Sequence, residues 1–513
     1  MIVMKFGGSS VESAKAIQRV ACIVRDHSGC PPAVVVSAMG KTTDRLLAIA
    51  HLYADGYLKP AGQALAKLHH FHLTEASYLA RGAQAVWLDN QICGLFEEFD
   101  QVLKEARESG SLTPRLSDAV LSFGERLSSV MVTAGFRQMG VDAIHLDARK
   151  AIVTDGRHTQ AAPLFIQTNA LLRRGISTEQ VTVMGGFIAA TEDGVPTTLG
   201  RGGSDYTAAI VGAALAADEI QIWTDVDGML TCDPRVVPGA HCLRSISYAE
   251  AEQMAKAGAK VLHPATVLPA IRQGIPVVIR NSRNPAAPGT RIVRENPCDG
   301  AVMSIACRSG IALLQVIPRN TPVTADFGND IWDAFEKAGI QFNLIATTSK
   351  EISLVVDEAS LTPAFQHRLG AVAEVEVQEG RAMVTLVGYN ASRNPSNLAR
   401  ASQQLRKTPG GAILAWCSDS QFAFVVAADA LDAAAHALHN EFFGQPDPAL
   451  FIPNRACLAA GESPALRSVS LRFAEPGATL RPDFPGLQFR KIGDRELAAD
   501  FPVSSPRALN LPH

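Results

Sequence analysis

The first glycine-rich loop of the sequence contains the residue types expected of an anion-binding site. It reads Lys5-Phe6-Gly7-Gly8-Ser9-Ser10 and follows a short β-branched segment. Glycines let backbone N–H groups approach a phosphate closely, a helix N-terminus favours an anion, and a lysine adds a positive charge. Ser9-x-x-Glu12 has the form of a capping box, which predicts a helix beginning just after the glycines. A Gly-Gly pair alone indicates only a tight turn, and Val35 stands where a Walker A loop ending at Gly40-Lys41-Thr42 would need glycine.

The second glycine-rich loop gives a stronger signal. Three glycines, an arginine, a hydroxyl and a carboxylate lie within six residues, Gly200-Arg201-Gly202-Gly203-Ser204-Asp205. Arg201 can hold a carboxylate through two parallel hydrogen bonds. Ser204 is expected to cap the following helix, where its side chain would also face a bound substrate. Asp205 could cap the same helix, orient lysines or hold a metal ion. We interpret this loop as part of an anion-binding site.

Four other segments are ambiguous when each is taken alone. Residues 223–235, WTDVDGMLTCDPR, could form an acidic turn, and they lack the later glutamate of a calcium loop. Residues 258–264, GAKVLHP, could be an ordinary helix end. The histidines of 69–72 and 436–439 lie in helical, apolar-flanked stretches without clustered cysteines or carboxylates, so packed or surface histidines are expected there. We therefore assign no metal ligand.

Composition limits the classes of protein to consider. The chain has 513 residues, 47% of them hydrophobic, and a net charge of −3. This length predicts about three domains, and the charge balance leaves no broad basic field for nucleic acid. The most apolar stretch, 206–217, is too short to span a membrane, and the N-terminus lacks the pattern of a signal peptide. Nine cysteines without a C-x-x-C pair suit reduced thiols. We expect a cytoplasmic multidomain enzyme with no nucleic-acid or membrane partner.

Strand-like and helical patterns alternate through the first 295 residues, which predicts an α/β fold with a largely parallel sheet. Apolar residues at helical spacing also predict mainly helix over 45–115. In such sheets ligands bind at the carboxyl ends of the strands, where the glycine-rich loops fall. The expected strands are 2–6, 33–36, 181–184, 220–223 and 275–279.

The order of strand-like and helical patterns changes after Pro288-Gly289. Two strand–helix–strand–strand assemblies of about 70 residues each fit the stretch up to Phe443, a size typical of small α+β domains. Ten of the 29 prolines then fall in the last 68 residues, and Val469, Leu471 and Phe473 allow a short strand there. The predicted domains are 1–295, 296–380, 381–445 and a proline-rich tail of unknown role, 446–513.

Six motifs, in this order and spacing, resemble aspartate kinases of the amino-acid kinase superfamily. The resemblance implies the amino-acid-kinase fold, followed by two ferredoxin-like ACT domains with the first inserted in the second. Residues 302–309 would then belong with 381–443. The motifs are KFGGSS at 5–10, SAMGKTT at 37–43, GERLS at 124–128, GRGGSD at 200–205, TDVDGMLTCDPR at 224–235 and GAKVLHP at 258–264.

The resemblance also implies a reaction and its site. Such enzymes transfer the γ-phosphoryl group of ATP, with Mg²⁺, to the β-carboxylate of L-aspartate, the first step toward lysine, threonine, methionine and diaminopimelate. That carboxylate is ionised at pH 7, so no general base is required. The implied residues are Lys5 and Asp205 for catalysis; Ser37, Thr43, Glu125, Phe187, Arg201 and Ser204 for the substrate; and Lys5, Gly7, Gly8, Ser9, Thr224, Asp225, Arg235 and Lys260 for ATP.

The sequence departs from the family pattern in two places. Leu230 stands where relatives often have tyrosine, so a contact with the base is missing there. The resemblance places an amino-acid effector at Asn343, Thr348 and Ser349, but relatives can offer aspartate at the first of these positions. Asparagine brings no charge to pair with an amine, so we hypothesise weakened or altered feedback inhibition.

Two alternatives stay open. One is another carboxylate kinase of the superfamily, acting on glutamate or N-acetylglutamate. The other is a catalytically silent ACT-domain sensor that binds an amino acid without turnover. The 68 residues after Gln445 are too few for a fused homoserine dehydrogenase. A homodimer formed through the ACT domains is the expected assembly.

Overall fold

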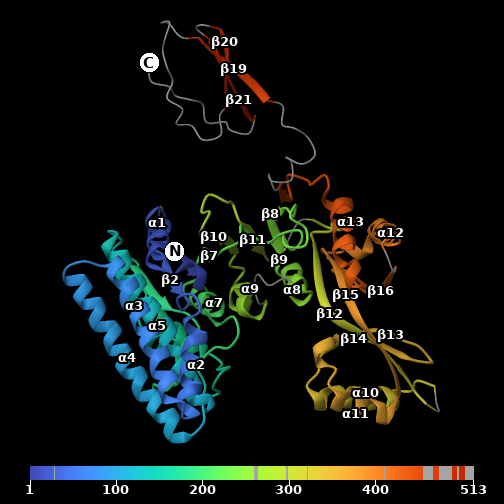
Figure 1. Ribbon diagram of the computed structural model, residues 1–513, viewed down its shortest axis with the longest axis horizontal. Helices are drawn as coiled ribbons and strands as arrows, with labels where there is room; N and C mark the ends of the chain where they lie inside the picture. Colours follow the sequence, from blue (N-terminus) through green and yellow to red (C-terminus); the bar gives the residue numbers. More distant parts are fainter. Residues whose placement is uncertain are drawn as a thin grey trace. The chain divides into compact units, whose positions relative to one another are not determined.

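The computed structural model describes residues 1–27, 29–258, 264–295, 298–319, 322–408, 411–453, 466–472, 488–493 and 496–502 (Figure 1). The chain divides into two units, Met1–Ile452 and Pro453–His513.

An eight-stranded sheet organises the first part of Met1–Ile452. Its order is β3-β4-β2-β1-β7-β10-β11-β9, and every neighbouring pair is parallel except β10 and β11. This confirms the predicted α/β fold, and the five expected strands are present. The bounds are β1 Ile2–Phe6, β2 Ala33–Val36, β3 Ala143–Leu146, β4 Val181–Gly185, β7 Glu219–Thr224, β9 Ser245–Ser247, β10 Val277–Asn281 and β11 Thr290–Val293.

Helices cover both faces of this sheet. Alternate residues of a strand point to opposite faces, and accordingly Val3 and Val35 join one apolar core while Met4 and Val34 join the other. Helices α2 to α5 lie together as a bundle on the Met4 side (Figure 1). The helices are α1 Ala14–Arg25, α2 Thr42–Ala54, α3 Leu58–Leu79, α4 Ala83–Ser109 and α5 Pro114–Gln138 on that side, with α6 Phe165–Gly175, α7 Gly203–Leu215, α8 Tyr248–Lys256 and α9 Leu268–Gln273 packed into the other core.

Two helix starts differ from the sequence prediction. The glycines lead into a short 3₁₀ turn, Gly8–Ser10, and α1 begins only at Ala14. The predicted capping box at Ser9 and Glu12 is therefore wrong, because Ser13 caps α1 by accepting a hydrogen bond from the Ala16 N–H. Ser204 does not cap α7 either: the N-cap is Gly202, in a left-handed conformation with φ of 72°. Ser204 instead lies in the first turn of the helix.

A six-stranded antiparallel sheet, β13-β14-β12-β15-β17-β16, follows. Its two long central strands serve both α+β units. Ser304–Ser309 of β12 pairs with 382–387 of β15, whereas Ile311–Val316 pairs with β14 as well as with β15, and the register with β15 shifts around Gly310. The bounds are β12 Ser304–Ile317, α10 Ala325–Ala338, β13 Phe342–Thr347, β14 Ile352–Asp357, α11 Pro363–Val372, β15 Glu374–Val387, α12 Pro395–Leu405, β16 Ala412–Ser418, β17 Gln421–Ala427 and α13 Leu431–Phe443.

Short strands complete the two units. In the first, β5 Ile188–Ala190 pairs with β6 Pro196–Thr198, and β8 Cys242–Leu243 pairs with β18 Phe451–Ile452. In the second, β19 Leu466–Arg472 and β20 Gln488–Gly493 flank β21 Glu496–Pro502. The expected strand at Val469 and Leu471 is β19, and Phe473 lies outside the described residues. None of the described helices is both long and apolar enough to cross a membrane.

Candidate active site

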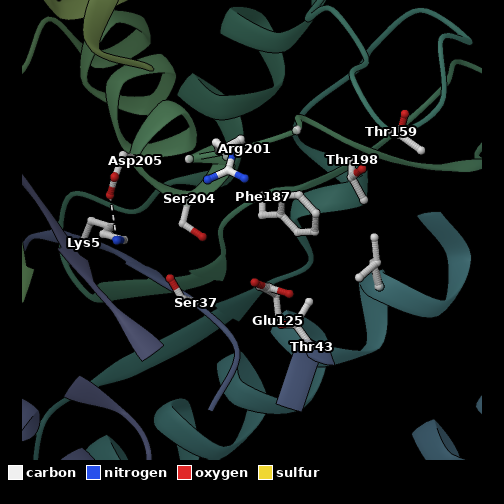
Figure 2. A pocket seen from close by; sticks show the side chains of 14 residues that line it. Lys5, Ser37, Thr43, Glu125, Thr159, Phe187, Thr198, Arg201, Ser204 and Asp205 are labelled. Atoms are coloured by element: carbon white, nitrogen blue, oxygen red, sulfur yellow. Dashed lines mark ion pairs between the residues drawn. The ribbon is translucent and has the colours of Figure 1, made fainter. Parts of the chain in front are cut away.

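A pocket of about 440 Å³ lies where β1, β2 and β4 reach their carboxyl ends (Figure 2). It brings together all eight residues predicted for catalysis and substrate binding, although they come from five separate segments of the chain. The labelled side chains face a common space (Figure 2). These residues are Lys5, Ser37, Thr43, Glu125, Phe187, Arg201, Ser204 and Asp205. Their individual roles remain predictions.

An ion pair forms one wall of the pocket. Lys5 Nζ in β1 lies 2.7 Å from Asp205 Oδ1 in the first turn of α7, and the side chains are only 11% and 15% exposed. Charges that are partly withdrawn from water interact more strongly than exposed ones. The carboxylate therefore fixes the ammonium group of Lys5 at the pocket.

A buried carboxyl forms another wall of the pocket. Glu125 Oε1 accepts a hydrogen bond from the Ala38 N–H at 3.2 Å. Its other oxygen, Oε2, is buried without a hydrogen-bond partner in the described part of the chain. Burial raises the pKa of the Glu125 carboxyl to about 8, despite the opposing effect of the Ala38 bond. A buried acceptor without a partner is unfavourable, so this atom is suited to receive a ligand's N–H group.

The arginine loop and Phe187 close the pocket. Phe187 adopts a φ of 64°, a conformation uncommon for a bulky residue. Its N–H donates to Thr207 Oγ1 at 2.9 Å, which holds this conformation. A Cβ on Gly203 would lie 2.6 Å from Phe187 Cδ2, so only glycine lets α7 begin this close to the ring. Arg201 is exposed at the pocket, and its guanidinium lies beside Ser204 and Phe187 in Figure 2.

Sequence reasoning missed one organising residue, Asp118. This fully buried carboxylate in α5 accepts hydrogen bonds from Thr198 Oγ1 at 2.6 Å and from the Thr159 N–H at 2.9 Å. It also lies 2.9 Å from His158 Nδ1. Both threonines line the pocket. The available signal was an aspartate seven residues before Glu125, on the same face of the helix.

A second cavity, of about 500 Å³, contains part of the predicted nucleotide site. Asp225, Leu230 and Arg235 line it, and so do Ser304–Cys307 of β12. Arg235 pairs with Asp233 at 2.6 Å, which raises the pKa of the arginine and lowers that of the aspartate.

The other predicted nucleotide residues lie around the end of β7 or outside the described part of the chain. Thr224 ends β7, and its hydroxyl donates to Asp225 Oδ1 at 3.2 Å. Gly7 donates its N–H to the Trp223 carbonyl at 3.0 Å, which ties the first glycine loop to β7. Gly8 and Ser9 form the 3₁₀ turn that follows. Lys260 lies outside the described residues.

The predicted effector residues lie on an edge strand and the turn after it. Asn343 in β13 pairs with Val355 of β14. The Thr348 hydroxyl accepts N–H bonds from Lys350 and Glu351, at 3.2 and 3.1 Å. Ser349 accepts an N–H bond from Val323 through its carbonyl.

The histidines noted in the sequence have packing partners. His72 Nδ1 lies 2.9 Å from the Leu68 carbonyl, and His439 Nε2 lies 2.9 Å from Thr231 Oγ1. Burial lowers the pKa of each to about 4.

Comparisons with known proteins agree with this geometry. The amino acid kinase family model matches residues 1–281. Lysine-sensitive aspartokinase 3 of Escherichia coli (strain K12) is 35% identical over 404 residues, which cover 77% of this chain and 88% of that protein. The bifunctional aspartokinase/homoserine dehydrogenase 2 of Zea mays, a chloroplastic protein, is 32% identical over 86% of this chain, which spans half of that relative's length. The crystal structure of E. coli aspartokinase III with aspartate and ADP superposes with a TM-score of 0.72 and 30% identity, covering 86% of this chain and all of that one.

Proposed function

Because this chain belongs to the aspartokinases of the amino acid kinase family, we propose that its pocket transfers the γ-phosphoryl group of ATP to the β-carboxylate of L-aspartate. The product is 4-phospho-L-aspartate. One observation carries the proposal: a single cavity holds Arg201 and, across from it, Glu125, whose buried Oε2 has no hydrogen-bond partner among the described residues. This pattern complements the α-carboxylate and α-ammonium groups of a free amino acid.

Each end of the substrate has a matching partner. Arg201 binds the α-carboxylate through paired hydrogen bonds, and Glu125 Oε2 accepts from the α-ammonium group. The hydroxyls of Ser37, Thr43 and Ser204 supply further hydrogen bonds in the same cavity. The β-carboxylate then points toward Lys5.

The chemical step requires positioning and charge neutralisation. An oxygen of the ionised β-carboxylate attacks the γ-phosphorus, a new O–P bond forms, and the bond from the γ-phosphorus to the β-phosphate oxygen breaks to release ADP. Lys5 neutralises charge on the transferring group, and Asp205 holds Lys5 in place. Since the attacking oxygen carries no proton, no residue acts as a base.

The donor set of the pocket suits magnesium that arrives with the nucleotide. The described residues contain no group of three or more His, Cys, Asp or Glu side chains able to hold an ion by themselves. Mg²⁺ commonly uses one or two carboxylates and completes its coordination with phosphates and water. Asp205, which pairs with Lys5, is the pocket carboxylate that would hold it. When bound, magnesium supplies neutralisation of the phosphate charge.

Regulation and assembly extend the proposal. Residues 1–295 form the catalytic part, and 296–445 form paired regulatory domains that dimerise and bind an amino-acid effector near Asn343, Thr348 and Ser349. A lysine-sensitive relative supports an effector of this class. Because Asn343 carries no charge, we expect weak inhibition by lysine or threonine. We place the protein in the cytoplasm. Its reaction is the first step of the pathway to the aspartate-derived amino acids.

A hydroxylamine trap tests the reaction. With Mg-ATP and L-aspartate, the acyl phosphate is captured as aspartyl hydroxamate. We expect product from the wild type and none from Lys5→Ala or Arg201→Ala. L-Glutamate and N-acetylglutamate serve as competing acceptors, and the acetylated amine cannot form the ammonium pair with Glu125. Absence of hydroxamate with all three acceptors, despite ATP binding, would favour the silent amino-acid sensor.

A further inference from the structure

A third cavity, of about 360 Å³, lies at the carboxyl ends of β3 and β4, beneath α4 and α5. It shares no described lining residue with the substrate pocket. Its volume is within the usual range for small-molecule sites, and the carboxyl edge of a parallel sheet is where such sites form. Polar and charged side chains dominate the lining: Asn90, Gln91, Arg126, Ser129, His145 and Lys150.

The cavity has an excess of positive charge. Arg126 is only 9% exposed; its Nη2 lies 2.5 Å from Glu98 Oε2, and its guanidinium lies over the Phe123 ring. A guanidinium has five N–H donors, so this contact leaves most of them for another acceptor. Lys150 adds a second positive charge at the edge of the cavity.

The second carboxylate of the lining does not cancel this charge. Asp147 is already paired with Arg149, which lies 2.7 Å away and also donates its Nε–H. Although burial opposes the effect, these bonds lower the pKa of Asp147 and keep it ionised and occupied. With Arg149 included, three positive side chains, Arg126, Arg149 and Lys150, stand against two carboxylates, Glu98 and Asp147.

Neutral donors complete the pattern. Ser129 and His145 are held together, with Oγ to Nε2 at 3.0 Å, while Asn90 and Gln91 bring side-chain amides from α4. A largely buried arginine surrounded by hydrogen-bonding groups is typical of a site for carboxylate or phosphate groups. We propose that this cavity is a second ligand site that binds a small molecule carrying an oxyanion, held by Arg126 and Lys150.

The position of the cavity couples it to the substrate pocket. Adjacent residues of α5 serve the two sites: Glu125 faces the substrate pocket and Arg126 lines this cavity. A Cβ on Gly185 would lie 3.0 Å from Glu125 Cβ, so α5 packs against the end of β4 with no free space between them. A ligand that moves Arg126 therefore also moves Glu125. This effect on aspartate binding rests on the proposed function, whereas the oxyanion site itself does not.

Calorimetric titration of the full-length protein tests the site. The probes are inorganic phosphate and succinate, added with L-aspartate and ADP saturating the substrate and nucleotide sites. Two variants perturb the cavity in different ways. Lys150→Gln removes an exposed charge, and Gly94→Leu fills the cavity from α4, where a Cβ meets nothing within 4 Å. Gly62→Leu in α3 is the matched control, because a Cβ there is equally unobstructed and leucine favours a helix over glycine.

We expect at least one probe to bind the wild type and the Gly62→Leu control alike, and both cavity variants to bind it about tenfold or more weakly. Lys150→Gln loses one charged hydrogen bond to the probe, and the leucine of Gly94→Leu occupies space that the probe needs. The preferred probe then identifies a phosphate or a carboxylate ligand. Equal binding by all four proteins, or no binding of either probe at millimolar concentration, would overturn the site. Hydroxamate formation, measured without probes, reports separately on the proposed function.

Discussion

Replacing Glu125 by glutamine should make the ligand-free protein more stable at neutral pH. The carboxyl has an ordinary pKa of 4.5, which burial raises to about 8 in the folded protein. Between these values the folded state keeps a proton that the unfolded chain releases, so stability is present below pH 4.5 and is lost as pH rises toward 8. The loss is about 1.4 kcal/mol for each pH unit, or about 3 kcal/mol at pH 7. Glutamine does not titrate and keeps an oxygen for the Ala38 N–H, so it avoids this loss.

Urea unfolding of the ligand-free protein, at about pH 5 and about pH 7.5, measures the effect. The stability of Glu125→Gln relative to the wild type should grow with pH by about 1.4 kcal/mol per unit. Glu12→Gln is the control, because Glu12 is 46% exposed and its replacement should give no such trend. Parallel pH dependence of the wild type and Glu125→Gln would refute the reasoning, since it would mean that Glu125 is ionised in the empty pocket.

The same substitution should weaken aspartate binding. As pH rises, the wild type should lose stability but bind aspartate more tightly. The wild type must release the Glu125 proton before the carboxylate can pair with the α-ammonium group. Its KM for L-aspartate should therefore fall as pH rises toward about 8, by up to about tenfold per unit. The KM of Glu125→Gln should lack this dependence and exceed the wild-type value by about 10- to 100-fold near pH 8, the contribution of a charged hydrogen bond. An unchanged KM for L-aspartate in Glu125→Gln would contradict the proposed pairing of Glu125 with the α-ammonium group.

Three further substitutions test other contacts. Asp205→Asn removes the ion pair that holds Lys5, and the hydroxamate assay should show kcat lower by about 100-fold or more, with a smaller change in the KM for aspartate. His439→Phe removes the 2.9 Å hydrogen bond between His439 and Thr231. This substitution should raise the KM for ATP and lower the free energy of unfolding by about 1 kcal/mol. The control His436→Phe, at an exposed position, should change neither quantity. Gly203→Ala places a methyl group 2.6 Å from the pocket phenylalanine ring, and urea unfolding should show a loss of about 1–3 kcal/mol. If kcat, the KM for ATP or the free energy of unfolding stayed at the wild-type value, the contact tested by that substitution would not have the role given to it here.

The sequence predicted which residues meet in the first pocket because these residues lie in short motifs next to strand ends. Lys5, Ser37 and Arg201 each follow or end a segment whose type is visible locally. Asp118 and Thr159 could not be predicted, because their place at the pocket depends on a hydrogen bond between segments about 40 residues apart. An aspartate on the same face of the helix as Glu125 is a usable signal, but its partners cannot be found from spacing alone.

Element boundaries were less predictable than element types. Three serines lie just before α1, Ser9, Ser10 and Ser13. Ser9 and Ser10 lie in the 3₁₀ turn, whereas Ser13 has an extended backbone, with φ of −155°, that lets its side chain accept from the Ala16 N–H. For α7, Gly202 in a left-handed conformation begins the helix, so Ser204 is not needed as a cap. The packing of the loop decides which of several neighbouring residues caps a helix, and this packing cannot be predicted from the local sequence.

The long strand β12 belongs to the six-stranded antiparallel sheet and also lines the cavity proposed for the nucleotide. Its first residues, Ser304–Cys307, line the cavity. The Ile305 N–H donates to the Thr231 carbonyl at 2.7 Å, and Ser304 Oγ donates to the Leu230 carbonyl at 3.1 Å, so the nucleotide loop is hydrogen-bonded directly to this strand. Further along, β12 pairs with β14, the neighbour of the edge strand β13 that carries the predicted effector residue Asn343. An effector bound at the proposed site on β13 would therefore act through one strand, β14, on a strand that also lines the cavity proposed for the nucleotide.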